Sequence, residues 1–174
     1  MNPASPGKAM AFKERLARAK TIADVFTIVQ DVVRQEMGRE QAGLLVGLAD
    51  LGTSPQGFVG AFTIIPSNII IVNTRPLKRV RQTRPSLYIP YLFHVILHEY
   101  VHSVGSYDEE ETRRLVYKMS DRVFGEGHIA TKLAKDLSAF MPDLTYPWHG
   151  FQPPEGMEIE FVAGIDRKNV DYIS

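Results

Sequence analysis

Two histidines four residues apart, with a glutamate directly after the first, are the residues of this chain best suited to chemistry. They are His98, Glu99 and His102, in the segment HEYVH. On a helix, residues four apart share one face with Cβ atoms about 5–6 Å apart, so both imidazoles can reach one metal ion. Zinc held there lowers the pKa of a water molecule toward about 7, and Glu99, turned about 100° around the helix, can accept its proton. The spacing therefore predicts a zinc site for hydrolysis.

The helix that carries this motif must be followed by a turn that returns the chain toward the metal. From His98 the sequence reads HEYVHSVGSYD, so Gly105 and Asp108 follow at set intervals. Glycine adopts positive φ at little cost and often ends helices. This HExxHxxGxxD segment resembles the zincin metallopeptidases, and within them the metzincins. The resemblance implies Zn²⁺ as the cofactor, bound by His98, His102 and Asp108. It also implies that Glu99 is the general base for hydrolysis of a peptide or protein substrate.

The third ligand has a second interpretation. Asp108 and Glu111 form a D-x-x-E pair that is typical of a helix start, so Asp108 could instead be a plain N-cap. In that case the site resembles the gluzincins, in which a glutamate from a following helix completes the ligand set. The other candidates for the third ligand are Glu109, Glu110, Glu111, Asp121, Glu126 and His128.

Other residues near the motif are candidates for supporting roles. His94 lies four residues before the first motif histidine, and the helical drift of about 40° per step turns it beside the metal, as a cleft-lining residue. Tyr146 is favoured over Tyr100 and Tyr107 as a hydrogen-bond donor to the developing oxyanion. Metzincins also carry a methionine turn beneath the metal; none is obvious here, and Met141 is the better candidate for it.

The apolar pattern predicts a small mixed sheet, packed on the motif helix, with further helices before and after it. Thr21 and Asp24 resemble a capping box at a helix start, and Gly38 is expected to end that helix. The most apolar segment with a helical period, 86–104, carries the motif. Further helices are expected over 9–20, 108–125 and 129–140, and strands over 42–52, 57–66, 68–73 and 158–162. The resemblance to zincins implies that the strand 68–73 lies nearest the cleft.

Length and composition limit the class of protein. The 174 residues suit a single α+β domain of zincin-like fold over 1–174, with 1–20 as a loose N-terminal segment. The formal net charge of zero argues against a nucleic-acid or polybasic membrane partner, and the basic run 75–84 fits a solvated connection. The absence of cysteine excludes disulfides and thiolate metal sites. Because neither a signal-peptide pattern nor a long apolar run is present, we expect a cytoplasmic protein.

Two functions fit these residues. The first is a zinc-dependent metallopeptidase, with Glu99 as the general base. The alternative is a non-catalytic or regulatory module that binds a metal on the same zincin-like fold. Bound metal without cleavage of any peptide would distinguish the second from the first.

Overall fold

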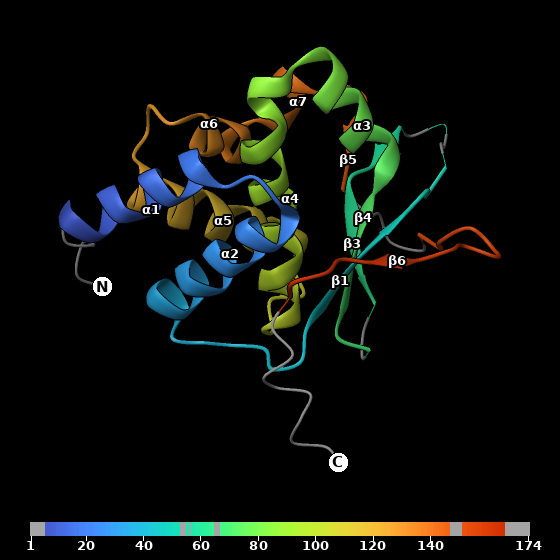
Figure 1. The fold of residues 1–174 in the computed structure, drawn as a ribbon, viewed down its shortest axis with the longest axis horizontal. Helices are drawn as coiled ribbons and strands as arrows, with labels where there is room; N and C mark the ends of the chain where they lie inside the picture. The colour runs from blue at the N-terminus through green and yellow to red at the C-terminus, as the bar shows by residue number, and fades with distance from the viewer. Residues whose placement is uncertain (1–5, 53–54, 56, 65–66, 147–150, 166–174) are drawn as a thin grey trace.

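One long helix, α4, stands between a layer of helices and a small sheet in the computed structural model of the chain (Figure 1). The structure describes residues 6–52, 55, 57–64, 67–146 and 151–165, with side chains from residue 11 onward. The helices are α1 (Pro6–Arg18), α2 (Ile22–Met37), α3 (Thr74–Thr83), the 3-10 turn η1 (Pro85–Leu87), α4 (Tyr88–Ser103), α5 (Glu109–Phe124), α6 (Ile129–Lys135) and α7 (Leu137–Phe140). The strands are β1 (Leu45–Ala49), β2 (Phe58–Val59), β3 (Ala61–Ile64), β4 (Ile69–Asn73), β5 (Leu144–Thr145) and β6 (Glu160–Phe161).

The main sheet has the strand order β3-β4-β1-β6, and β2 pairs separately with β5. β1 and β4 run parallel, whereas β3 is antiparallel to β4 and β6 is antiparallel to β1. Helices around a small mixed sheet confirm the predicted α+β class. Segment 68–73, expected nearest the cleft, forms the interior strand β4, and the edge strand that packs against α4 is β3 instead. Ile70, Ile71 and Val72 are each fully buried, as a strand covered on both faces requires.

The helix ends show which local sequence signals operate. At the start of α2, the Thr21 hydroxyl accepts a hydrogen bond from Asp24 N, and the Asp24 carboxylate accepts one from Thr21 N, which confirms the capping box. Gly38 ends α2 with a left-handed φ of 63°. The expected helix over 129–140 is divided, because Asp136 leaves the helical conformation and caps α7.

The structure corrects one expectation about the surface segments and extends another. Segment 1–20 is not loose where it is described, because α1 occupies Pro6–Arg18 and buries Phe12 and Leu16 in the core. The basic run 75–84 is solvated, as expected, because its basic side chains are exposed, but it forms most of the helix α3, which Asn73 caps through a hydrogen bond from Arg75 N. The helix forms because its residues Pro76, Leu77 and Val80 are buried on one side.

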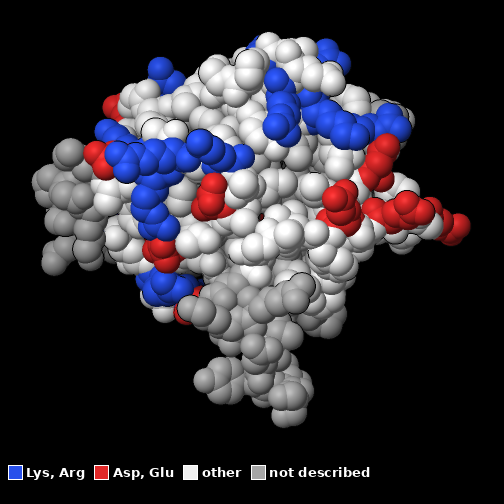
Figure 2. Space-filling view, in the orientation of Figure 1, with Lys and Arg blue, Asp and Glu red and all other residues white. Residues whose placement is uncertain are grey.

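The basic side chains of α3 lie on the surface at the top of the molecule (Figure 2). Several of them have partners within the chain. Arg75 pairs with Asp50 at 2.6 Å, and the Arg81 guanidinium lies 5.1 Å from the centre of the Tyr88 ring. Both contacts explain part of the basic run without an external ligand.

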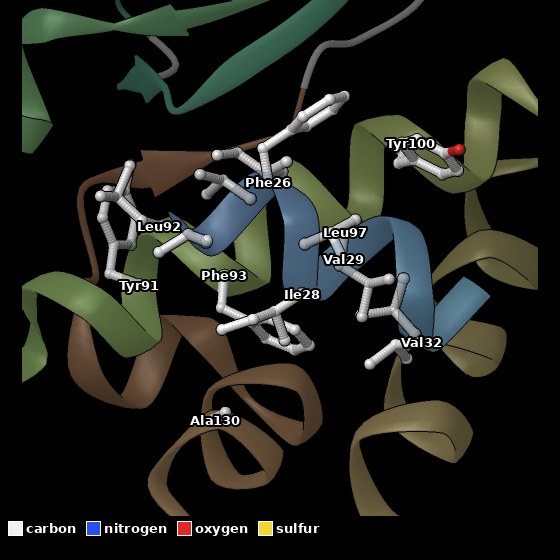
Figure 3. Packing of buried hydrophobic residues seen from close by; sticks show 14 of the residues in the cluster. Phe26, Ile28, Val29, Val32, Tyr91, Leu92, Phe93, Leu97, Tyr100 and Ala130 are labelled. Atoms are coloured by element: carbon white, nitrogen blue, oxygen red, sulfur yellow. The ribbon is translucent and has the colours of Figure 1, made fainter. Parts of the chain in front are cut away.

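The core lies mainly between α4 and the helices beside it. Figure 3 shows side chains of α2 meeting those of α4, among them Phe26, Val29 and Leu97. The ring of Phe26 meets that of Tyr100 edge to face, with centroids 6.0 Å apart. This packing of α2 against α4 holds α4 in place, and with it the residues of the motif.

No helix in the described part of the chain is long and apolar enough to cross a bilayer.

Candidate metal centre

Three side chains from α4 and α5 bring their polar atoms together at the C-terminal end of α4. The Nε2 atoms of His98 and His102 lie 3.2 Å apart. Glu109, in the first turn of α5, places Oε1 2.8 Å from His98 Nε2 and Oε2 3.1 Å from His102 Nε2. One donor atom from each residue lies within 4.8 Å of the others, so the three could hold one metal ion.

The turn between the two helices decides which acidic residue reaches the histidines. α4 ends at Ser103, and Gly105 follows with a φ of 115°, so the chain reverses there. Asp108, the expected third ligand, is the N-cap of α5: its Oδ1 accepts a hydrogen bond from Glu111 N at 2.7 Å. Glu109, one of the alternatives, joins the histidines instead. The group does not include the remaining alternatives, Glu110, Glu111, Asp121, Glu126 and His128.

The protonation of His102 makes the donor set suited to a cation. Nδ1 of His102 lies 2.6 Å from the carbonyl oxygen of Ser106, so it carries a proton and donates it to that carbonyl. Nε2 of the neutral ring then has a lone pair that faces the Glu109 carboxylate at 3.1 Å. Two acceptors at this distance repel each other unless a second proton or a metal ion lies between them. A hydrogen-bonded backbone carbonyl behind a ligating histidine is the usual orienting contact in metal sites.

The spacing and burial of the donors also fit a metal ion. Neighbouring donors of a tetrahedral zinc site lie roughly 3.3 Å apart, given bonds of about 2.0–2.1 Å. The contacts among the three residues, 2.8, 3.1 and 3.2 Å, are slightly shorter. Oε1 of Glu109 is buried and makes no hydrogen bond within the described part of the chain, although His98 Nε2 is close. Two imidazoles and one carboxylate are a donor set that zinc commonly takes.

The pKa values reflect the same cluster. Burial alone would raise the pKa of Glu109, but the contacts with His102 and His98 outweigh it and lower that pKa to about 2. Burial would lower the pKa of His102, yet the contacts with Glu109 and Ser106 and the charge of Glu99 together outweigh that effect, and the pKa is raised. Each shift favours a carboxylate beside an imidazolium, which is the charge pattern that a proton supplies in place of a metal ion.

Glu99 lies beside the cluster without joining it. Its side chain is buried, and its Oε2 accepts a hydrogen bond of 2.6 Å from the Thr63 hydroxyl on the edge strand β3. Burial raises the pKa of Glu99, although His98 and His102 oppose the shift. A carboxylate held close to the donors, with a raised pKa, is what a general base requires. Nothing in the strand pattern of 57–66 pointed to Thr63 as its partner.

His94 and Tyr146 form a second layer next to His98. Nε2 of His94 lies 3.0 Å from the Tyr146 hydroxyl, and burial lowers the pKa of His94 to about 3, so the ring is neutral. The Tyr146 ring stacks on that of His98, with centroids 4.4 Å apart. The predicted position of His94 beside the metal donors is what the structure shows. Tyr146 was expected to serve an oxyanion, and its hydroxyl is engaged by His94.

The other candidate residues lie elsewhere. The Tyr100 hydroxyl accepts a hydrogen bond from Gln41 N in the core, and Tyr107 is 72% exposed. His128 caps α6 by accepting a hydrogen bond from Ala130 N. Met141, the candidate for a methionine turn beneath the metal, lines a cavity of about 350 Å³ beside α3 instead. The side chain that stacks on His98 is Tyr146. His149 and residues 1–5 lie outside the described part of the chain.

Two cavities flank the cluster along β3. Ala61, at the start of β3, lines a space of only about 10 Å³ next to His98 and Glu99, which Tyr146 also lines. Thr63, nearer the end of the strand, lines a cavity of about 210 Å³ that reaches His102. The cluster is therefore nearly closed on the Tyr146 side and more open on the other.

No protein-family model matches the chain, and searches of curated proteins and of solved structures found no significant match. The resemblance to zincins therefore depends on the motif residues and on the geometry described above.

Proposed function

We propose that the protein is a zinc-dependent metallopeptidase, with the metal held by His98, His102 and Glu109. The observation that carries this proposal is the convergence of three donor atoms within 4.8 Å, beside a buried glutamate that follows the first histidine. The Glu109 carboxylate and Nε2 of His102 are stable at 3.1 Å only with a positive charge between them, either a second proton on the ring or a metal ion. The arrangement is explained if a cation belongs between them.

The residues have separate roles in the proposed reaction. Bound zinc supplies a Lewis acid and a water of lowered pKa. Glu99 would hold a water molecule through a carboxylate oxygen, accept its proton and later pass that proton to the leaving amine. The Thr63 hydroxyl donates a hydrogen bond to Oε2 of Glu99, which keeps the carboxylate in one orientation. Ser106, through its carbonyl, keeps the Nε2 atom of His102 free for the metal.

The edge strand supports a peptide as the substrate. β3 is the last strand of its sheet, and its residues line the cavities on both sides of the histidines. An extended peptide can pair with such an edge through backbone hydrogen bonds. Its chain would then cross the position at which the metal and Glu99 meet.

Zinc content and cleavage together test the proposal. Purified protein is expected to contain one zinc per chain by elemental analysis, and to cut a mixed peptide library. Glu99→Gln should keep the zinc and lose at least about a hundredfold in cleavage rate, because general-base catalysis typically contributes that much. Glu110→Gln, the same chemical change at an exposed neighbour, is the matched control and should keep both. Undiminished cleavage by the Glu99 variant would refute the assigned role.

A non-catalytic metal module is the second candidate, and one observation favours it. The space beside His98 and Glu99 is only about 10 Å³, and Tyr146 stacks on the His98 ring at its border. If this space stays closed, zinc would be bound without turnover. Tyr146→Ala, which enlarges the space, separates the two candidates: cleavage by this variant or by the wild type supports the enzyme, and zinc without cleavage in both supports the module.

A further inference from the structure

A basic depression of about 560 Å³ lies beside the histidine cluster, between α5 and the α6–α7 segment. Arg113 and Arg114 enter it from α5, and Lys135 enters it from the end of α6. Its wall is completed by β5 and Tyr146. The depression thus combines three cations from two helices with a ring that also contacts His98.

The positive charge of the depression is not balanced by its own lining. The acidic residue that lines it, Asp136, supplies one negative charge against three cations, and its Oδ1 accepts hydrogen bonds from the Ser138 hydroxyl and from Ala139 N as the N-cap of α7. Arg114 and Lys135 are exposed. Like charges that converge on one concave surface raise its positive potential, and an anion bound there relieves their repulsion.

Arg113 connects the depression to the metal cluster. Its guanidinium lies 4.3 Å from the centre of the Tyr146 ring, and its Nε lies 3.8 Å from Oε1 of Glu109. The Arg113 side chain is about half exposed, so a ligand can approach it from solvent. Only the Arg113 side chain would therefore separate an anionic group bound there from the proposed metal ligand Glu109.

We infer that this depression binds a carboxylate of the peptide substrate, close to the bond that is cut. The guanidinium groups of Arg113 and Arg114 are suited to bidentate contact with a carboxylate, and Lys135 adds a point charge. The carboxylate can belong to an acidic side chain or to the C-terminus of the peptide, since both present the same two oxygens. The inference rests on the proposed function for the reaction itself, but the binding step does not require turnover.

Peptide binding to the inactive Glu99→Gln protein tests the inference. The probes are four fluorescein-labelled octapeptides that differ only in one central Glu or Gln and in a free or amidated C-terminus. Fluorescence anisotropy at low salt is expected to show at least about tenfold tighter binding for a peptide with the recognised carboxylate, because hydrogen bonds to charged groups contribute that much. If replacing the central Glu by Gln weakens binding, the recognised carboxylate is the acidic side chain. If amidation weakens binding, the recognised carboxylate is the C-terminus of the peptide. Either result supports the inference.

Matched charge variants decide whether the depression is responsible. Arg114→Gln with Lys135→Gln should abolish the preference, whereas Arg18→Gln with Lys20→Gln, an equal change of charge at exposed residues of and after α1, should retain it. Equal preference in both double variants would overturn the inference, as would the same affinity for all four peptides in the parent protein. Zinc content, measured on the same samples, reports on the proposed function separately, because the substituted residues are not metal ligands.

Discussion

Two carboxylates, one buried and one partly exposed, attach α5 to its neighbours, and they differ in how their charge is met. Glu36 on α2 faces Arg122 of α5 at 2.7 Å and also accepts a hydrogen bond from the Gln35 amide at 3.0 Å. Arginine is cationic at every relevant pH, so this pair is complete within the chain. Glu109 at the other end of α5 faces two imidazoles at 2.8 and 3.1 Å, which are cationic only when protonated, and its nearest permanent cation, Arg113, is farther away at 3.8 Å. The first pair is complete within the chain, whereas the second is where the proposed metal ion would supply a closer positive charge.

The largest expected effect is that of metal on stability, because only the histidine cluster responds to it. At a free zinc concentration of about 1,000 times Kd, the free energy of unfolding should rise by about 4 kcal/mol over that of the chelated protein. Urea unfolding with zinc and with chelator measures the difference. Arg122→Met should show the same increment, since its site does not take part. Equal stability with and without zinc would remove the distinction between the two carboxylates.

The next effect is loss of the ion pair. Arg122→Met leaves the Glu36 carboxylate, whose side chain is only 4% exposed, without its cation. Because a buried charge without a partner is costly, the free energy of unfolding should fall by about 3 kcal/mol, with zinc affinity unchanged. Urea unfolding and a zinc competition assay measure the two quantities. Replacing both partners by methionine should recover most of the loss, since the unpaired charge is then absent.

Replacing each of the two carboxylates by its amide should weaken zinc binding in one variant and stability in the other. Glu109→Gln should weaken zinc binding by about a hundredfold or more, because a negatively charged ligand is replaced by a neutral one. Removing a residue that only supports a ligand typically weakens metal binding by about 10–100-fold. Glu36→Gln should leave zinc affinity unchanged and lower stability instead. Competition with a chromophoric chelator measures both variants. Similar zinc affinities for the two variants would mean that Glu109 is not a ligand.

The smallest expected effect concerns the residue next to Glu109. Asparagine caps helices about as well as aspartate does, so Asp108→Asn should change the free energy of unfolding by less than about 0.5 kcal/mol. Zinc affinity should also stay as it is, because the Asp108 side chain contacts the start of α5. The same chelator competition tests this. A loss comparable to that of Glu109→Gln would restore Asp108 as the third ligand.

Local signals in the sequence were sufficient for much of the fold. The capping box at Thr21, the stop at Gly38 and the turn at Gly105 depend on neighbouring residues, and each is where the pattern placed it. The basic helix α3 was missed because its buried side chains are few, although Asn73 before it is a good N-cap. Which strand forms the edge of the sheet depends on long-range pairing, and composition alone does not decide that.

Only the part of the site that lies on one turn of α4 was predictable from the sequence. The i, i+4 spacing of His98 and His102 places both on one face whatever surrounds them. The choice between Asp108 and Glu109 depends on how α5 is rotated against α4, which packing in the core decides. Thr63 reaches the cluster from β3 and Tyr146 from the residue after β5, both distant in sequence, and neither belongs to a recognisable pattern.

The donors of the proposed centre all belong to the short stretch of chain from α4 into α5, and this affects the order in which the molecule can assemble. Closing so short a loop costs little chain entropy, whereas pairing Gly47 of β1 with Phe161 of β6 must bring together distant parts of the chain. A cation can therefore join the two helices before the sheet is complete. If the proposed centre takes up its ion at that stage, it would be formed before β6 pairs with β1.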